Sequence, residues 1–193
     1  QTLTYFGRKF VVKDSLIVYD DTRFNTLNVY WKKQTETLAT IIGEVTIPAS
    51  IGEDMIVFKD NGNLYKVFHD GNTQEICAWN GNIDFQIGTQ ILCFNDPTTQ
   101  TFVVYENGQF SDVEGQFMRK YKAGRGFIVY EDLNANLWLY KNGVKTLLTN
   151  FLPSFWEVKD DIVVWGENSY FFTYVNDEKK QVCNYIPERW EIK

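Results

Sequence analysis

The sequence contains little of what catalytic and metal sites usually require. Its 193 residues include one histidine and three cysteines, and no two cysteines are spaced closely enough to form a zinc-ligand pair. His69 falls in a predicted turn, VFHDGN, with no partner that the sequence identifies. The G-x-S-x-G, H-E-x-x-H and phosphate-loop patterns are missing. We therefore expect no catalytic residues, no metal and no cofactor, and predict that the protein is not an enzyme.

Basic runs and long apolar runs are equally scarce. The formal net charge is -6 and the sequence pI is about 4.9, and no basic run occurs that could bind nucleic acid. No segment approaches the roughly 18 apolar residues that a membrane-spanning helix needs. We therefore expect neither nucleic-acid binding nor direct membrane insertion.

The first residue and the composition suggest a compartment. The chain begins at Gln1 rather than Met, as a mature protein does once a signal peptide has been removed. Asn, Lys, Tyr and Phe are plentiful while Ala and Arg are scarce, a bias typical of AT-rich bacterial genomes. The odd cysteine count weighs modestly against export. On balance we expect an extracytoplasmic location, in the periplasm or at the cell surface.

What the sequence does contain is a repeat. Five short runs, LIVY, MIVF, ILCF, FIVY and IVVW, end in aromatic residues at positions 19, 58, 94, 130 and 165, which are 39, 36, 36 and 35 residues apart. This period is typical of solenoids and propellers. An aromatic or small residue precedes each aromatic by nine positions, as Phe10 precedes Tyr19. The runs are β-branched, aromatic and too short for helices, so they predict strands.

The apolar runs also predict how the sheets pack. Consecutive apolar positions require burial on both faces of a strand, which sheets stacked around an axis provide. Each run leads into a second apolar strand, a tight turn such as Asn107-Gly108 or Asn142-Gly143, and a more polar strand. The sequence therefore predicts an all-β fold, a β-propeller of four-stranded antiparallel blades, with about five repeats of 35–39 residues present.

In strand order and turn placement the chain resembles the WD40-like and TolB-like families of bacterial propeller repeats over almost its whole length. The resemblance implies a propeller fold. The Trp-Asp and Gly-His signatures of WD40 repeats are absent, and so is the Ser-Pro-Asp-Gly turn of TolB repeats, where this sequence has Lys13-Asp14, Gly52-Glu53-Asp54 or Lys159-Asp160-Asp161. The function of neither family is therefore implied.

We predict a single domain. Residues 1–8 are the outer strand of a closing blade, five blades span 9–46, 47–83, 84–119, 120–153 and 154–187, and 188–193 begin a further blade. The last assignment rests on Trp190-Glu191-Ile192-Lys193, which repeats Trp156-Glu157-Val158-Lys159. Our preferred interpretation is part of a propeller with six or more blades. A five-bladed ring, whose last segment pairs with a neighbour, is the alternative.

One face of the predicted propeller combines acidic and apolar loops. These loops join the second strand of a blade to its third, and the fourth strand to the next blade. An apolar patch with a polar rim is typical of a binding surface, although Asp and Asn also form turns and loop hydrophobics also pack between blades. The candidate partner-binding residues are Trp79, Phe117, Met118, Phe151, Leu152, Asp20, Asp60, Asp96, Glu131 and Glu167.

These features predict a non-catalytic scaffold or accessory subunit that binds a protein partner within a larger, cell-envelope-associated bacterial assembly. Two alternatives stay open. One is a lectin-like propeller that binds carbohydrate with aromatic platforms and acidic acceptors. The other is a propeller hydrolase or lactonase that uses loop carboxylates or a metal.

Overall fold

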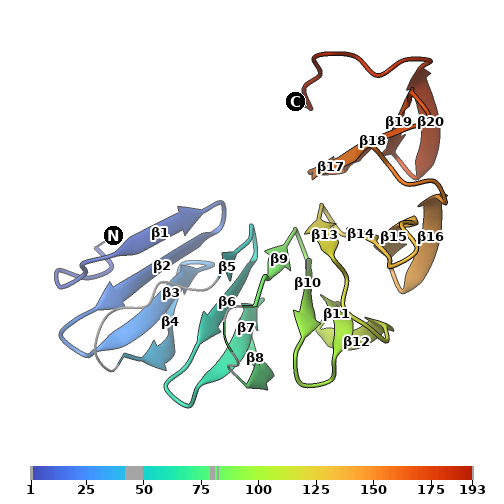
Figure 1. Ribbon diagram of the computed structural model, residues 1–193. Helices are drawn as coiled ribbons and strands as arrows, with labels where there is room; N and C mark the ends of the chain where they lie inside the picture. The colour runs from blue at the N-terminus through green and yellow to red at the C-terminus, as the bar shows by residue number, and fades with distance from the viewer. Residues whose placement is uncertain (1, 42–49, 79–80, 82, 193) are drawn as a thin grey trace. The chain divides into compact units, whose positions relative to one another are not determined.

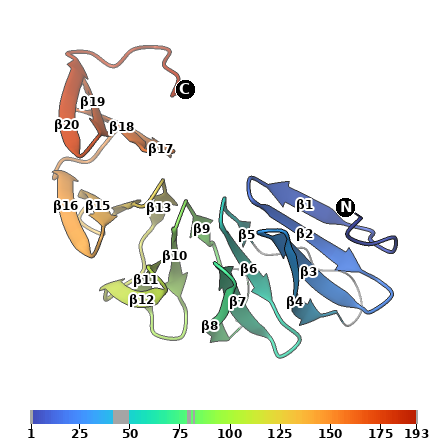
Figure 2. The same ribbon diagram turned by 180° about the vertical axis from the view of Figure 1, so that it is seen from behind.

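The computed structural model describes residues 2–41, 50–78, 81 and 83–192. Within these residues twenty strands and no helix occur, and the strands form five four-stranded antiparallel sheets (Figure 1, Figure 2). Each sheet is a meander whose consecutive strands pair, and we number the sheets as blades 1 to 5. The described part of the chain contains no helix that could cross a membrane. The predicted all-β fold of four-stranded blades is confirmed.

The chain divides into two compact units, Gln1–Phe85 and Gln86–Lys193. Unit 1 holds blades 1 and 2, whose predicted boundary at residues 46 and 47 lies outside the described residues. Its strands are β1 (Phe10–Lys13), β2 (Leu16–Asp21), β3 (Thr26–Trp31), β4 (Gln34–Thr40), β5 (Ser50–Ile51), β6 (Met55–Lys59), β7 (Leu64–His69) and β8 (Asn72–Ala78). An outer strand was predicted over residues 1–8, and the described part of that range, residues 2–8, forms no strand.

Unit 2 holds blades 3 to 5. Its strands are β9 (Gln86–Ile87), β10 (Ile91–Asp96), β11 (Thr101–Glu106), β12 (Gln109–Glu114), β13 (Lys120–Ala123), β14 (Ile128–Glu131), β15 (Leu137–Lys141), β16 (Val144–Thr149), β17 (Phe155–Lys159), β18 (Ile162–Glu167), β19 (Tyr170–Val175) and β20 (Glu178–Cys183). That all five blades form one domain stays a prediction.

The two residues of the nine-residue spacing lie on the first and second strands of a blade, and their pairing sets the register of that hairpin. The two aromatics lie directly opposite each other on antiparallel neighbours, where side chains on one face of a sheet are in contact. Ala49, the small residue of the second repeat, lies outside the described residues. The pairs in the structure are Phe10 with Tyr19, Tyr121 with Tyr130 and Trp156 with Trp165.

The hydrophobic core lies between neighbouring blades. Blades 3 and 4 share one cluster, in which the Phe102 ring centroid lies 5.1 Å from that of Tyr121 and 5.2 Å from that of Tyr130. Blades 4 and 5 share a second, built around Trp156 and Trp165. In unit 1 the cluster joins strands of blades 1 and 2. The blades therefore use both faces, as the consecutive apolar positions predict.

Every blade carries a β-bulge between its third and fourth strands. One residue of the fourth strand has no cross-strand partner, and that residue is apolar in all five blades. A bulge re-aims a side chain, and Leu148 is thereby buried in the core between blades 4 and 5. The five residues are Leu38, Ile76, Val113, Leu148 and Val182.

Two glycines allow the first hairpins of blades 3, 4 and 5 to approach closely. A Cβ atom at Gly88 would lie 1.8 Å from the carbonyl oxygen of Gly124, and one at Gly124 would lie 2.7 Å from the carbonyl oxygen of Asp160. The Arg125 amide donates a hydrogen bond to that Asp160 oxygen at 2.6 Å. Backbone contact therefore holds these hairpins together.

Replacing Gly88 by Ala should lower the free energy of unfolding by about 2 kcal/mol or more, because the new methyl group overlaps backbone that cannot move aside. Urea unfolding measures the change. Gly115→Ala is the matched control, since no atom lies within 4 Å of a Cβ at Gly115. Equal stability of the two variants would contradict the close approach of the hairpins.

The hairpin between the third and fourth strands turns on two residues with positive φ. This confirms the turns predicted at Asp70-Gly71, Asn107-Gly108, Asn142-Gly143 and Asn176-Asp177. In blade 1 the same turn is Lys32-Lys33, with φ of 44° and 66°. The left-handed conformation is energetically unfavourable for lysine, because its Cβ atom comes too close to the following carbonyl oxygen, so the turn is strained.

Lys33→Gly should raise the free energy of unfolding by about 0.5–1 kcal/mol, because relief of the left-handed penalty exceeds the extra freedom of glycine in the unfolded chain. The reciprocal change, Gly143→Lys, should lower it by a similar amount, since φ is +75° and the space around a Cβ is open. Thermal unfolding of both variants tests this. Opposite signs are expected, and a loss of stability in Lys33→Gly would refute the strain.

Candidate partner-binding face

The predicted face is formed by the loops at one end of the strands in each sheet. We call this end of the strands the loop edge of the sheet. In blade 4 the row of cross-strand partners nearest this edge is Lys120, Glu131, Leu137 and Thr149. The segment before β13, the loop from β14 to β15 and the segment after β16 all continue beyond this row. Side chains of these three segments therefore emerge at the same edge of blade 4.

The acidic residues at this edge accept hydrogen bonds from their own loops and neighbours. Asp20 is buried and its Oδ1 accepts from the amides of Arg8 and Lys9, at 2.7 and 2.8 Å. Asp96 is buried, and its Oδ1 accepts from the Thr98 amide at 2.7 Å. Asp and Asn commonly stabilise turns in this way.

Asp132 shows this structural role most fully. Its Oδ1 accepts from the amides of Asn134 and Asn136, at 2.8 and 2.9 Å, and its Oδ2 accepts from Asn136 Nδ2 and Trp138 Nε1, at 2.8 and 2.9 Å. Burial alone raises the pKa of Asp132, but hydrogen bonds from Asn136, Trp138 and Asn134 outweigh burial and hold the pKa below its ordinary value. The carboxylate fixes the loop between β14 and β15.

Asp60 is held in a comparable way in unit 1. Its Oδ1 accepts from the Leu64 amide at 3.0 Å and its Oδ2 lies 2.8 Å from Lys66 Nζ. Burial raises the pKa of Asp60, but the bonds from Lys66, Leu64 and Gly62 outweigh it and lower the pKa. The Lys66 pKa is raised, chiefly by its hydrogen bond to Asp60. This pair closes the loop between β6 and β7.

The two glutamates among the candidates bind indole N–H groups of large core tryptophans. Glu131 Oε2 accepts from Trp156 Nε1 at 3.3 Å, and so connects blade 4 to blade 5. Glu167 is nearly buried, and its Oε2 accepts from Trp165 Nε1 at 3.2 Å. Because a buried indole N–H needs an acceptor, both contacts stabilise the fold.

The apolar candidates divide into buried and exposed residues. Met118 is buried in the core shared by blades 3 and 4, and its backbone N–H and C=O both bond to the Asn95 side chain, at 2.9 and 2.8 Å. Phe117, Phe151 and Leu152 are exposed, with Leu152 reaching 69%. Trp79 lies outside the described residues. The structure therefore brings three of the five apolar candidates to the surface.

Leu133 belongs with the exposed group and was not predicted. It lies in the Asp132 loop, and its side chain is about half exposed. No repeat position marks it in the sequence, since the equivalent loops differ in length and composition. We call Phe117, Leu133, Phe151 and Leu152 together the blade 4 rim.

The loop after β16 is fixed at both ends. Its first turn is closed by the Phe151 amide, which donates to Thr149 Oγ1 at 3.1 Å. At the other end the Ser154 amide donates to the Gly166 carbonyl at 2.9 Å, and Pro153 between them is buried. These contacts hold Phe151 and Leu152 outward.

Lys120 lies at the same edge of blade 4. Its Nζ is 4.1 Å from the centroid of the Trp156 ring and 3.4 Å from the Trp156 carbonyl oxygen. Burial, followed by the nearby Lys122 charge, lowers the pKa of Lys120, while Glu131 and Glu157 oppose that change. The ammonium group thus contributes a cation–π contact between blades 4 and 5.

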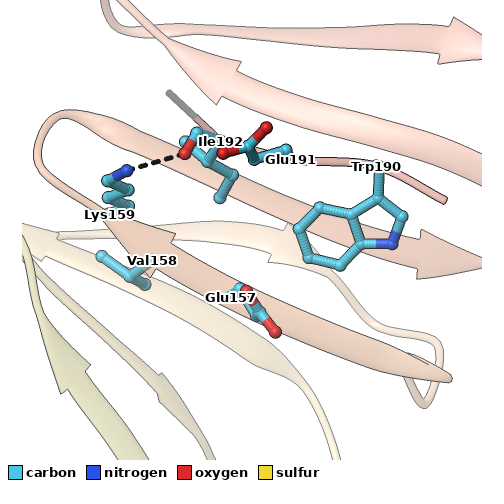
Figure 3. A pocket seen from close by; sticks show the side chains of 6 residues that line it. All are labelled: Glu157, Val158, Lys159, Trp190, Glu191 and Ile192. Carbon is cyan, nitrogen blue, oxygen red and sulfur yellow. Dashed lines mark hydrogen bonds between the residues drawn. The ribbon is translucent and has the colours of Figure 1, made fainter.

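A surface pocket of about 460 Å³ lies between β17 and the C-terminal segment. Figure 3 shows the side chains that line it, and the hydrogen bond of 2.7 Å that Lys159 Nζ donates to the Ile192 carbonyl. None of the predicted candidates lines this pocket. Its lining residues are Glu157, Val158, Lys159, Trp190, Glu191 and Ile192.

Cysteine and histidine form no metal cluster in the part of the chain that the structure describes, where no three His, Cys, Asp or Glu side chains gather. None of the three cysteines, all of which lie in the described residues, forms a disulfide; Cys93 is buried, whereas Cys77 and Cys183 are only partly buried. His69 Nε2 lies 3.8 Å from Asp54 Oδ2.

Replacing Asp132 by Asn should lower the free energy of unfolding by about 1–2 kcal/mol at neutral pH, because an amide NH₂ group would then face two donors. The folded pKa of Asp132 lies below its unfolded value, so its contribution is complete above the unfolded pKa of about 4 and is lost as pH falls through the folded pKa.

The Asn variant should therefore lose less stability than the unsubstituted chain between about pH 6 and pH 3. Urea unfolding across this range measures the difference. Asp161→Asn makes the same change in charge at an exposed side chain and should behave like the unsubstituted chain. Parallel pH profiles for all three proteins would show that Asp132 does not stabilise the loop.

The four-stranded meanders, packed face to face within each unit, define a β-propeller repeat protein. A family model described as a 10-bladed beta propeller domain matches residues 1–193, and the chain belongs to this family. No curated protein matches the chain.

Solved structures with a similar fold include the CRINKLY WD40 ectodomain of the Arabidopsis thaliana receptor kinase ACR4. It is 8% identical with a TM-score of 0.51, over 95% of this chain and 69% of that one. Yeast RCC1 (Prp20), solved with Kap60 bound, is 7% identical with a TM-score of 0.50, over 86% and 55%. The computationally designed Ika8 protein is 14% identical with a TM-score of 0.41, over 83% and 55%.

This chain thus spans little more than half the length of two of these three structures. At such identities the likeness shows the fold alone. The predicted resemblance to WD40-like propellers is confirmed at that level.

Proposed function

We propose that this chain is a non-catalytic scaffold or accessory subunit that binds a protein partner within a larger assembly of the bacterial cell envelope. The observation that carries the proposal is the blade 4 rim, four large apolar side chains exposed at one edge of a single blade. Exposed apolar clusters beside polar groups are typical of protein-interaction sites.

The rim is suited to binding because its side chains are already held in place. Phe151 and Leu152 lie on a loop bonded at both ends, and Phe117 is adjacent to the anchored Met118. Leu133 lies within the loop that Asp132 fixes. A partner would therefore bury apolar surface, worth about 1.5–3 kcal/mol for each large side chain, with little cost in ordering the loops.

The carboxylates support a non-catalytic role. Asp60 and Asp132 have lowered pKa values and are bonded to groups of their own loops, while Glu131 and Glu167 bind indole N–H groups. A general acid or base needs a pKa near the working pH and access to a substrate. These groups instead serve the fold.

Yeast RCC1, which has a similar fold, has been solved with Kap60 bound, so a protein of this fold is known to bind another protein. The bacterial assignment rests on the residue composition of the sequence alone.

The experiment is affinity purification from the native envelope with the chain carrying Phe151→Asp and Leu152→Asp. We expect a stoichiometric partner with the unsubstituted chain and its loss, by at least tenfold, with this double variant, because two charges would enter the apolar contact. Val144→Asp with Leu147→Asp is the matched control, since both side chains are exposed on the outer strand β16.

Circular dichroism must show that both double variants are folded. Retention of the partner by the Phe151/Leu152 variant would refute the rim as its binding site. Loss of the partner from both variants would show that the contact is not specific to the rim.

A further inference from the structure

The loop between β2 and β3 differs from the equivalent loops of the other four blades. Those loops contain neither an aromatic nor a basic residue. The blade 1 loop contains both, as Arg23 followed by Phe24, and the Phe24 side chain is 64% exposed. Both residues lie beyond the last cross-strand pair of the hairpin, which Asp21 forms with Thr26. They are therefore at the loop edge and not on a face against which another blade packs.

The segment before β1 brings a second aromatic ring to this loop. The guanidinium carbon of Arg23 lies 5.8 Å from the centroid of the Phe6 ring and 5.1 Å from that of Phe24. Both distances are typical of cation–π contacts. Phe6 is about half exposed, so the three side chains place two aromatic rings around one cation at the surface. We call Phe6, Arg23 and Phe24 together the blade 1 cluster.

Hydrogen bonds fix the segment of Phe6 on the loop. The Phe6 carbonyl oxygen accepts from the Thr22 amide at 3.2 Å and from Thr22 Oγ1 at 2.6 Å. Thr4 Oγ1 donates to Asp21 Oδ2 at 2.7 Å. These bonds hold the Phe6 ring next to Arg23, so a ligand would have little of the site to order when it binds.

The guanidinium group of Arg23 has donors available for a ligand. Among the described residues no side chain forms an ion pair with it. Asp21 binds the backbone amide of Arg23 instead, through Oδ1 at 3.0 Å. Because the N–H donors of a guanidinium group lie in one plane, two of them match the two oxygens of a carboxylate. Arg23 is therefore suited to bind a carboxylate.

Charge limits the ligand to few acidic groups. The formal net charge of the chain is -6, which disfavours polyanions such as nucleic acid. The cluster supplies one cation, and the Asp21 carboxylate lies in the same loop. A ligand with one carboxylate and several hydroxyl groups suits both, because each Asp21 oxygen has a second lone pair that a hydroxyl can use. A sugar acid has this composition, whereas a peptide rich in Asp or Glu would be repelled by Asp21.

We propose that the blade 1 cluster binds a uronic acid residue of an acidic glycan. The sugar carboxylate accepts two N–H donors of Arg23, its hydroxyl groups donate to Asp21, and the apolar face of its ring lies on Phe24. The site is in unit 1 and shares no residue with the blade 4 rim. Either proposal can therefore fail without the other.

Methyl glucuronide and methyl glucoside are matched probes, because one has a carboxylate where the other has a hydroxymethyl group. Titration of the isotope-labelled whole chain with each sugar, followed by NMR, tests the proposal. We expect methyl glucuronide to shift the amide signals of the loop between β2 and β3. The affinity for methyl glucoside should be about tenfold lower, because it cannot form the charge-assisted hydrogen bonds.

Three variants separate the contributions to binding. Arg23→Gln should lower the affinity for methyl glucuronide about tenfold and leave the weak binding of methyl glucoside unchanged. Phe24→Ala should weaken the binding of both sugars, because the ring contacts the part that they share. Arg189→Gln removes the same charge from an exposed arginine of unit 2 and should change neither. Signals outside the loop report whether each variant is folded.

Equal affinity for the two sugars would overturn the proposal. So would an Arg23→Gln chain that binds methyl glucuronide as tightly as the unsubstituted chain, or loop signals that methyl glucuronide does not shift. A triglutamate peptide that binds this loop more tightly than methyl glucuronide would show that the ligand is an acidic peptide and not a sugar.

Discussion

Burial of both faces of each blade is the constraint on which the rest of this structure depends. A four-stranded sheet with apolar residues on both sides cannot be stable in water by itself, so each blade needs a neighbour on either face. The aromatic side chains at the paired positions of the first two strands fill the space between blades, as Trp156 and Trp165 do. The apolar bulge residue, such as Leu148, extends the same contact to the outer strand.

The loops at the ends of the strands are stabilised by hydrogen bonds rather than by apolar packing. Acidic side chains there, Asp132 above all, accept hydrogen bonds that fix the turns between the buried strands. With these loops fixed, apolar side chains that they carry, such as Phe151 and Leu152, are exposed to solvent. Rigid strands that carry loops of independent sequence are the usual basis of a binding scaffold.

Much of the architecture could be predicted from the sequence because the same pattern of apolar strands and turns occurs five times. The nine-residue spacing is a cross-strand pair, and the Asn-Gly and Asp-Gly turns fix the hairpins. The candidate site was less accessible. Met118 and Phe117 are adjacent apolar residues in one loop, yet Asn95 holds the first in the core while the second is exposed. Leu133 had no pattern that would mark it.

The sequence by itself determined the strand type, the strand order and the blade length, because local periodicity and turn chemistry act over short distances along the chain. Only the tertiary structure decided which loop side chains are buried. It also decided the strained Lys32-Lys33 turn and the roles of Asp96, Glu131 and Asp132 as acceptors within the fold. Burial and hydrogen bonding depend on which residues lie side by side after folding, and that information is spread over residues distant in the chain.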